Sequence, residues 1–268
     1  MDADVLTVEN VSAGYGDKPV LHGVAMAAAR GEFVGLIGPN GSGKTTLLRV
    51  MSGVLRPSDG TVRLKGADLR GIRWRALART MACLSQEIAL DLPFAVREVV
   101  LMGRSPHLSQ LGGETREDLE VAERCMALAD VSQIADRPIT EISGGERQRA
   151  FIAMCLAQEP EILVLDEPTS HLDIGHQLSV LNLVRKLNRD GGVTVIAVFH
   201  DLNLAAEYCD RVLLLNGGRV EAWGAPADVI TAAMIGKVYG AKVLTEPNPV
   251  SGRPHVVLFA RAGRERPE

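Results

Sequence analysis

The chain has 268 residues, of which 46% are hydrophobic, and carries a net charge of −4 with an isoelectric point near 5.9. This length supports one substantial hydrophobic core, with room for a smaller appended subdomain. The acidic balance, with basic residues clustered only in RAGRER (261–266), argues against a groove for nucleic acid. The start of the chain, MDADVL, lacks a secretory signal, and no stretch approaches the roughly 18 apolar residues of a membrane helix. We therefore expect a cytoplasmic protein that reaches a membrane only through a partner.

The first 30 residues alternate apolar and polar positions between glycines, which predicts short antiparallel strands. An apolar run at 32–38 is followed by a glycine-rich turn and by helical spacing over 44–55. A strong turn then precedes a further predicted strand at 61–66. From about 87 to 160 the pattern becomes helical, in three segments: 96–103, 115–131 and 145–158.

Apolar runs at 161–165 and 193–199, each bounded by helical segments, predict buried strands of a parallel sheet. We therefore expect an α/β fold: a P-loop NTPase core with a mostly parallel sheet, an N-terminal antiparallel β subdomain and an inserted helical subdomain. The last residues hold two weak strand signals, at 241–246 and 255–260, and a polar tail.

Four cysteines lie in apolar contexts without paired spacing: Cys83, Cys125, Cys155 and Cys209. Such scattered thiols are typical of a reduced hydrophobic core and do not form the close pairs of a metal site. We expect all four to be core residues.

The strongest motif is GPNGSGKT, which fits G-x-x-x-x-G-K-[ST] between a predicted strand and a predicted helix. Glycines allow backbone N–H groups to curl around phosphate oxygens, and the helix N-terminus adds partial positive charge. Lys44 would contact the outer phosphates, and the Thr45 hydroxyl can bind Mg²⁺. The motif thus predicts a nucleotide site at Gly38, Pro39, Asn40, Gly41, Ser42, Gly43, Lys44, Thr45 and Thr46.

Two adjacent acids, Asp166 and Glu167, follow the apolar run at 161–165. Asp166 alone could be a helix cap. Beside a phosphate loop, the pair is better explained by catalysis: Asp166 would hold Mg²⁺, usually through water, and Glu167 would act as general base on the attacking water.

Gln86 and His200 each end a predicted strand, and either one alone is more often structural than catalytic. In open α/β sheets, however, ligands bind beyond the carboxyl ends of the strands, where all of these residues should meet. We assign Gln86 to Mg²⁺ and the attacking water, and His200 to the γ-phosphate. Tyr15 could stack on an adenine ring, although packing within the N-terminal strands explains it equally well.

The stretch ISGGERQR places Gly144 and Gly145 in the first turn of a predicted helix, where each glycine costs roughly 1 kcal/mol relative to alanine. Ser143 and Glu146 have the spacing of a capping box, but that box does not need the glycines. Bare backbone at a helix N-terminus can bind an anion. A second phosphate half-site suggests a two-fold arrangement in which each chain completes the other's nucleotide site.

These motifs, in this order, resemble the nucleotide-binding subunit of an ABC transporter over nearly the whole chain. The resemblance is carried by GPNGSGKT, Gln86, ISGGERQR, ILVLDEPTSHLD and VFHDLN. It implies one ABC nucleotide-binding domain over 1–268, with a helical subdomain at about 87–160 and a C-terminal extension at about 240–268. Two departures are small: Ile142 and His171 stand where leucine and alanine are commoner.

The resemblance further implies ATP and Mg²⁺ as cofactors and a head-to-tail homodimer that sandwiches two ATP molecules. In this arrangement Ser143, Gly144, Gly145 and Glu146 of one chain would belong to the ATP site of the other, and Asp173 would lie at the dimer interface.

Longer stretches, 92–108, 147–188 and 198–220, are similar to the ATPases of bacterial importers for iron–siderophore complexes, haem and cobalamin. That branch implies an ATPase coupled to transmembrane transport (an ABC-type translocase) at the cytoplasmic face of the inner (plasma) membrane. Its partners would be two integral-membrane permease subunits and, indirectly, a periplasmic or lipoprotein substrate-binding protein, with no nucleic acid. Residues 87–108 would help to form the cleft for a permease helix, although Leu92, Pro93 and Phe94 could equally be core residues.

Two alternatives stay open. Non-transport ABC ATPases act in DNA repair or translation, but these carry long coiled coils or two nucleotide-binding domains per chain. A P-loop switch or kinase would have no use for ISGGERQR.

Overall fold

The computed structural model describes residues 4–86, 92–109 and 112–259. A six-stranded sheet forms its centre, in the order β10-β9-β3-β8-β7-β6. Five of these strands pair in parallel, and β10 pairs antiparallel with β9. The strands are β3 (Phe33–Ile37), β6 (Met81–Leu84), β7 (Ile162–Leu165), β8 (Thr194–Val198), β9 (Arg211–Asn216) and β10 (Arg219–Gly224). The predicted parallel sheet is confirmed.

Both faces of this sheet are covered, which explains why its strands are continuously apolar. Successive residues of a strand point to opposite faces, so Phe33 and Leu163 enter one hydrophobic cluster while Val34 and Ile162 enter the other. The cluster on the first face includes residues of α3 (Val96–Met102), α4 (Arg116–Leu128), α5 (Gly144–Ala157), α6 (Ile174–Gly191) and α7 (Leu202–Tyr208), and of the two C-terminal helices described below.

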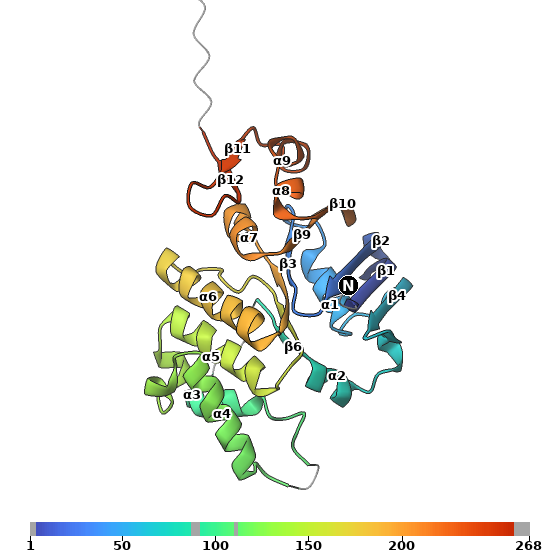
Figure 1. The fold of residues 1–268 in the computed structure, drawn as a ribbon. Coiled ribbons are helices and arrows are strands. Elements are labelled where there is room, and N and C mark those ends of the chain that lie inside the picture. The colour runs from blue at the N-terminus through green and yellow to red at the C-terminus, as the bar shows by residue number, and fades with distance from the viewer. Residues whose placement is uncertain (1–3, 87–91, 110–111, 260–268) are drawn as a thin grey trace, which may run out of the picture.

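The second face packs against α1 (Lys44–Met51) and a four-stranded antiparallel sheet in the order β2-β1-β4-β5 (Figure 1). Its strands are β1 (Asp4–Tyr15), β2 (Lys18–Ala29), β4 (Asp59–Leu64) and β5 (Ala67–Asp68). This sheet confirms the predicted N-terminal antiparallel strands. A 3₁₀ turn at Leu69–Gly71 and helix α2 (Trp74–Thr80) return the chain to β6.

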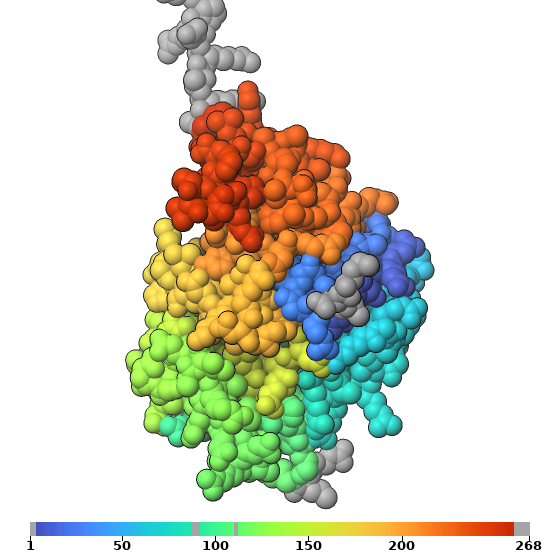
Figure 2. Space-filling view, in the orientation of Figure 1, coloured from blue at the N-terminus to red at the C-terminus, as the bar shows by residue number. Residues whose placement is uncertain are grey.

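The C-terminal elements gather at one end of the molecule, opposite the helices of residues 96–157 (Figure 2). They are α8 (Pro226–Val229), α9 (Ala232–Tyr239), and a hairpin of β11 (Leu244–Pro247) and β12 (Pro254–Val257). Arg253 fastens this hairpin to the end of α7, because its Nη1 donates to the carbonyl oxygens of Ala206 and Cys209 at 2.7 and 2.6 Å. Of the helices in the described ranges, none is long and apolar enough to cross a membrane.

A buried ion pair joins α3, α4 and α5, the three α-helices that follow β6 in the described residues. Arg104, just after α3, is 3% exposed and donates from Nε to Asp118 Oδ1 of α4 at 2.8 Å. Its Nη1 also donates to the carbonyl oxygen of Ala157, at the end of α5, and to Glu159 Oε2. Short 3₁₀ turns at Ser132–Ile134 and Ile139–Glu141 link α4 to α5. The ion pair of Arg104 and Asp118 thus links these helices to one another. The boundaries of a helical subdomain stay a prediction.

We predict that Arg104→Ala lowers the free energy of unfolding by about 3 kcal/mol, because it leaves the buried Asp118 carboxylate without its partner. Arg116→Ala, which removes the exposed pair with Glu120 on the same helix, should cost less than about 0.5 kcal/mol. Urea unfolding of both variants tests this.

The same pair gives a pH signature. Hydrogen bonds from Arg104, above all, lower the pKa of Asp118 to about 2. The stability that this adds is present above the ordinary aspartate pKa of about 3.9 and is lost as pH falls toward 2. Equal unfolding free energies for Arg104→Ala and Arg116→Ala at pH 7 would contradict the buried-pair account.

Candidate functional site

The phosphate loop connects the end of β3 to the start of α1. Gly38, Gly41 and Gly43 have positive φ angles of 149°, 74° and 104°, a region that side chains disfavour. A Cβ on Gly38 would also lie 2.2 Å from the carbonyl oxygen of Leu215. The backbone conformation of the loop therefore requires glycine at these positions even without a bound ligand.

Lys44 is the first residue of α1, and its side chain is buried in the loop. Its Nζ donates to the carbonyl oxygens of Gly38 and Pro39 at 2.8 and 3.0 Å. The buried Oγ of Ser42 has no hydrogen-bond partner within the described part of the chain. A central cation, a helix N-terminus and an unpartnered buried hydroxyl together fit a bound phosphate group.

Asp166 follows β7 and is only 7% exposed, and the Thr45 hydroxyl donates to its Oδ1 at 3.4 Å. Burial raises the pKa of Asp166 and lowers the pKa of Lys44. Among the described residues, no group of three His, Cys, Asp or Glu side chains could hold a metal. A hydroxyl and one carboxylate suit Mg²⁺, which takes few protein ligands beside phosphate oxygens.

Glu167 is held by donors from three chain segments. Its carboxylate accepts hydrogen bonds from Gln86 Nε2 at 2.8 Å and from the Ser170 hydroxyl at 2.8 Å, and lies 2.5 Å from His200 Nε2. The backbone of Glu167 has a φ of +52°, which is uncommon outside glycine and recurs at functional sites. Ser170 is a part of the site that the sequence analysis missed.

The structure brings the four predicted strand ends together around one open pocket of about 540 Å³. Residues Asn40 to Thr46 line it, together with Val20, Gln86, Glu167 and His200. Asp166 lies in the adjoining pocket, which shares Thr45 and Gln86. The predicted residues therefore lie close together, as their predicted roles require. The chemical roles themselves stay predictions.

Tyr15 lies at the end of β1, and 44% of it is exposed. Its hydroxyl accepts a hydrogen bond from Arg49 Nη1 at 2.9 Å, and the guanidinium lies 5.8 Å from the ring centroid. Tyr15 is not among the residues that line the phosphate-loop pocket, so its stacking on adenine stays a prediction.

The segment of residues 143–146, here called the Ser143 turn, begins α5 with a full capping box. The Ser143 hydroxyl accepts from the Glu146 backbone N–H at 3.3 Å, and Glu146 Oε2 accepts from the backbone N–H and the hydroxyl of Ser143 at 2.9 and 2.7 Å. These hydrogen bonds lower the pKa of Glu146. The turn does not line the phosphate-loop pocket of its own chain.

The two glycines of the Ser143 turn have different surroundings. Gly144 is exposed, and a Cβ there would meet only the side chain of Leu172, at 3.6 Å. Gly145 is buried, and a Cβ there would lie 2.1 Å from Cδ2 of His176. The close approach that the sequence predicted at this backbone is therefore made, at Gly145, by a side chain of the same molecule.

Asp173 caps α6, and its Oδ1 accepts from the backbone N–H of His176 at 2.9 Å. The side chain of Asp173 is 70% exposed, so it is accessible to a second molecule. Its predicted place at a dimer interface stays a prediction.

One expectation was wrong. Cys125, Cys155 and Cys209 are buried core residues, but Cys83 is exposed. It belongs to β6, the edge strand of the six-stranded sheet, and lines the pocket beside Gln86. Met81, on the same face of β6, is buried, so the strand is uncovered only near its end at Cys83, which an apolar sequence context does not reveal.

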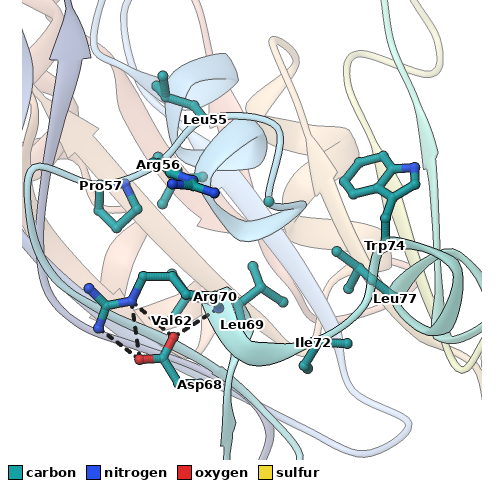
Figure 3. Close-up of a pocket in the computed structure, with 12 residues that line it drawn as sticks. Leu55, Arg56, Pro57, Val62, Asp68, Leu69, Arg70, Ile72, Trp74 and Leu77 are labelled. Atoms are coloured by element: carbon teal, nitrogen blue, oxygen red, sulfur yellow. Dashed lines mark hydrogen bonds and ion pairs between the residues drawn. The ribbon is translucent and has the colours of Figure 1, made fainter.

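A second, smaller cavity of about 230 Å³ lies away from these strand ends, between α1 and residues 55–77 (Figure 3). Its walls are mainly apolar, and Arg70 and Asp68 pair with each other at 2.7 Å beside it. It contains none of the predicted site residues.

Comparisons with known proteins agree with this arrangement. The ABC transporter family matches residues 21–170. The chain is 39% identical to the ferric enterobactin transport ATP-binding protein FepC of Escherichia coli (strain K12), over 94% of this chain and 93% of FepC. It is 42% identical to the hemin import ATP-binding protein HmuV of Pseudomonas entomophila (strain L48), over 94% of this chain and 99% of HmuV. It is also 42% identical to the cobalamin import ATP-binding protein BtuD of Halobacterium salinarum (strain ATCC 29341 / DSM 671 / R1), over 87% of this chain and 58% of BtuD.

Solved structures give the same result. A metal-chelate type ABC transporter in an inward-facing conformation matches with a TM-score of 0.85 and 26% identity, over 97% of this chain and 99% of that one. The ATP-binding cassette MJ0796, a dimer bound to ADP and Pi in a post-hydrolysis state, matches with a TM-score of 0.72 and 28% identity, over 82% and 98%. The predicted fold class and family resemblance are thus confirmed.

We predict that Gly145→Ala is less stable than Gly144→Ala. The Cβ at 145 collides with the His176 ring and should lower the free energy of unfolding by about 2 kcal/mol. The Cβ at 144 would make an ordinary van der Waals contact with Leu172 at 3.6 Å, and alanine favours a helix more than glycine does, so that variant should be as stable as the parent or slightly more stable. Thermal unfolding of the two variants measures the difference. Equal midpoints would show that the His176 contact does not constrain position 145.

Proposed function

The chain belongs to the ABC transporter family, and from that premise we propose that it is the ATP-hydrolysing subunit of a bacterial importer for an iron–siderophore complex, haem or cobalamin. The observation that carries this proposal is the Glu167 carboxylate, held by Gln86, Ser170 and His200 at the mouth of the phosphate-loop pocket. The import function is supported by similarity to proteins named for the transport of ferric enterobactin, hemin and cobalamin.

ATP would bind with its phosphates against the loop from Gly38 to Thr46, where Lys44 and the backbone N–H groups at the start of α1 supply positive charge. Thr45 and Asp166 would hold Mg²⁺, with Gln86 beside them. A bound Mg²⁺ would neutralise phosphate charge during the reaction.

Glu167 has the properties of a general base for the attacking water. It is the outer of the two acids and lines the pocket, whereas Asp166 is buried beside Thr45. The three donors fix the direction of its carboxylate, and general-base catalysis depends on that geometry. His200, 47% exposed, would contact the γ-phosphate from the other side of Glu167.

The Ser143 turn would complete the ATP site of a second chain. This follows from its exposed Gly144, its place at a helix N-terminus, and its absence from the pocket of its own chain. A head-to-tail homodimer with Asp173 at the interface would bring each turn to the other chain's γ-phosphate. The dimeric MJ0796 cassette bound to ADP and Pi supports such a pairing.

The permease would dock beside the strand end that carries Gln86. Leu92 is 61% exposed and available for a partner, whereas Phe94 packs against the core. Of the two alternatives, permease contact therefore suits Leu92 and core packing suits Phe94. Residues 87–91 of the predicted cleft lie outside the described residues. Two permease subunits would hold the ATPase pair at the cytoplasmic face of the inner membrane, and a substrate-binding protein would act on it only through them.

We predict that Glu167→Gln binds ATP but hydrolyses it at least a hundredfold more slowly, because a general base contributes about 10²–10⁴ in rate. The variant should accumulate as a dimer in ATP. Phosphate release and size-exclusion chromatography measure the two effects. Glu161→Gln, at the opposite end of the same strand, is the matched control and should turn over normally. Normal turnover by Glu167→Gln would refute the assignment.

We predict that two defective chains rebuild one working site when paired. Lys44→Met removes the cation of the phosphate loop, and Gly144→Asp places a negative charge where the partner's phosphate should lie while remaining compatible with a helix N-terminus. Co-expressed chains with different tags, purified in two steps in ATP, give only the mixed pair. This pair should hydrolyse ATP at up to about half the parent rate, since one of two sites is intact, and each variant alone should be nearly inactive.

The shared-site proposal fails if the mixed pair is no faster than either variant alone, or if a monomer held apart by dilution hydrolyses ATP at the full rate.

A further inference from the structure

His176 is the third residue of α6, and its ring lies against the first turn of α5. An ideal Cβ on Gly145 would lie 2.1, 2.6 and 2.9 Å from Cδ2, Cγ and Nε2 of that ring. The imidazole therefore fills the space in which a side chain at position 145 would stand. A Cβ built on Gly144 would lie farther from its nearest neighbour, 3.6 Å from Cδ2 of Leu172.

The orientation of this ring is fixed by the cap of its own helix. Asp173 Oδ1 accepts the backbone N–H of His176 at 2.9 Å and lies 2.8 Å from His176 Nδ1. Rotation of the ring would break the second contact. These hydrogen bonds also lower the pKa of Asp173, which keeps the capping carboxylate ionised.

We propose that His176 is a positioning residue that fixes the Ser143 turn to Asp173, so that both segments meet the second chain as one unit. The inference rests on the proposed function, in which both segments face that chain. It adds a specific link between them: the carboxylate of Asp173 holds the ring, and the ring holds the backbone of Gly145.

This link gives the two glycines separate purposes. Gly145 leaves space for the imidazole of its own chain, and Gly144 leaves the outer surface of the turn bare. A displacement of about 1 Å in a group that contacts a reacting phosphate can cost on the order of a hundredfold in rate. The His176 side chain is 40% exposed, but its contact with Asp173 Oδ1 holds the ring against Gly145, so His176 is placed to set where the turn presents its N–H groups.

The mixed pair of Lys44→Met and Gly144→Asp chains tests this directly, because its single working site takes the Ser143 turn from the Lys44→Met chain and the phosphate loop from the other. His176→Ala in the chain that supplies the turn should reduce kcat about tenfold. The same substitution in the chain that supplies the loop should change kcat less than twofold. A general loss of stability would lower both arms equally.

His176→Asn keeps an atom at the positions of Cγ and Cδ2 and a donor at the position of Nδ1, so it should restore most of the rate in the sensitive arm. It also serves if His176→Ala folds poorly. Equal losses in the two arms, no loss in either, or no difference between His176→Asn and His176→Ala would overturn the inference. An inactive parent mixed pair would instead overturn the shared site itself, so the two failures are distinguishable.

Discussion

The parallel register of β6, β7, β8 and β3 is the constraint on which the site depends. Leu84 pairs with Leu165, Leu165 with Ala197, and Val198 with Leu36, so the four strands end at the same edge of the sheet. The residues that follow these positions are the ones that meet at the pocket. A slip by one residue would turn the buried side chains of a strand to its other face, which both hydrophobic clusters oppose. Apolar packing thus fixes the place of the polar groups.

That register also makes the unusual backbone at Glu167 tolerable. A positive φ outside glycine costs on the order of 1 kcal/mol or more. Hydrogen bonds to a charged group are stronger than neutral ones, and the Glu167 carboxylate takes them from Gln86 and Ser170, with His200 beside it. Gln86 and His200 follow other strand ends than Glu167, whereas Ser170 lies three residues after it, so two of the three contacts exist only in the assembled sheet.

Sequence patterns predicted the elements whose signals are local. Continuous apolar runs predicted β3, β6, β7 and β8 of the central sheet, and the glycine, lysine and threonine spacing predicted the phosphate loop with its helix α1, but β9 and β10 were not predicted. Helices α2, α8 and α9, of 7, 4 and 8 residues, were missed, whereas α3, also of 7 residues, was predicted because Val96, Val99 and Val100 recur at helical spacing. Ser170 and the exposure of Cys83 were missed for different reasons. Ser170 lies only three residues after Glu167, but no motif marked its hydroxyl as a donor, whereas the exposure of Cys83 depends on how distant segments pack around β6.

The pair of glycines in the Ser143 turn illustrates the same limit. The sequence predicted that a phosphate group approaches the backbone at both glycines. In the folded chain, the ring of His176 already occupies the space beside Gly145, and only Gly144 remains open. A capping box satisfies the first donors of α5 within the chain, yet the bare surface at Gly144 has no packing role there. A folded chain that keeps an exposed glycine in the first turn of a helix, at a cost of roughly 1 kcal/mol, leaves room for something that approaches from outside.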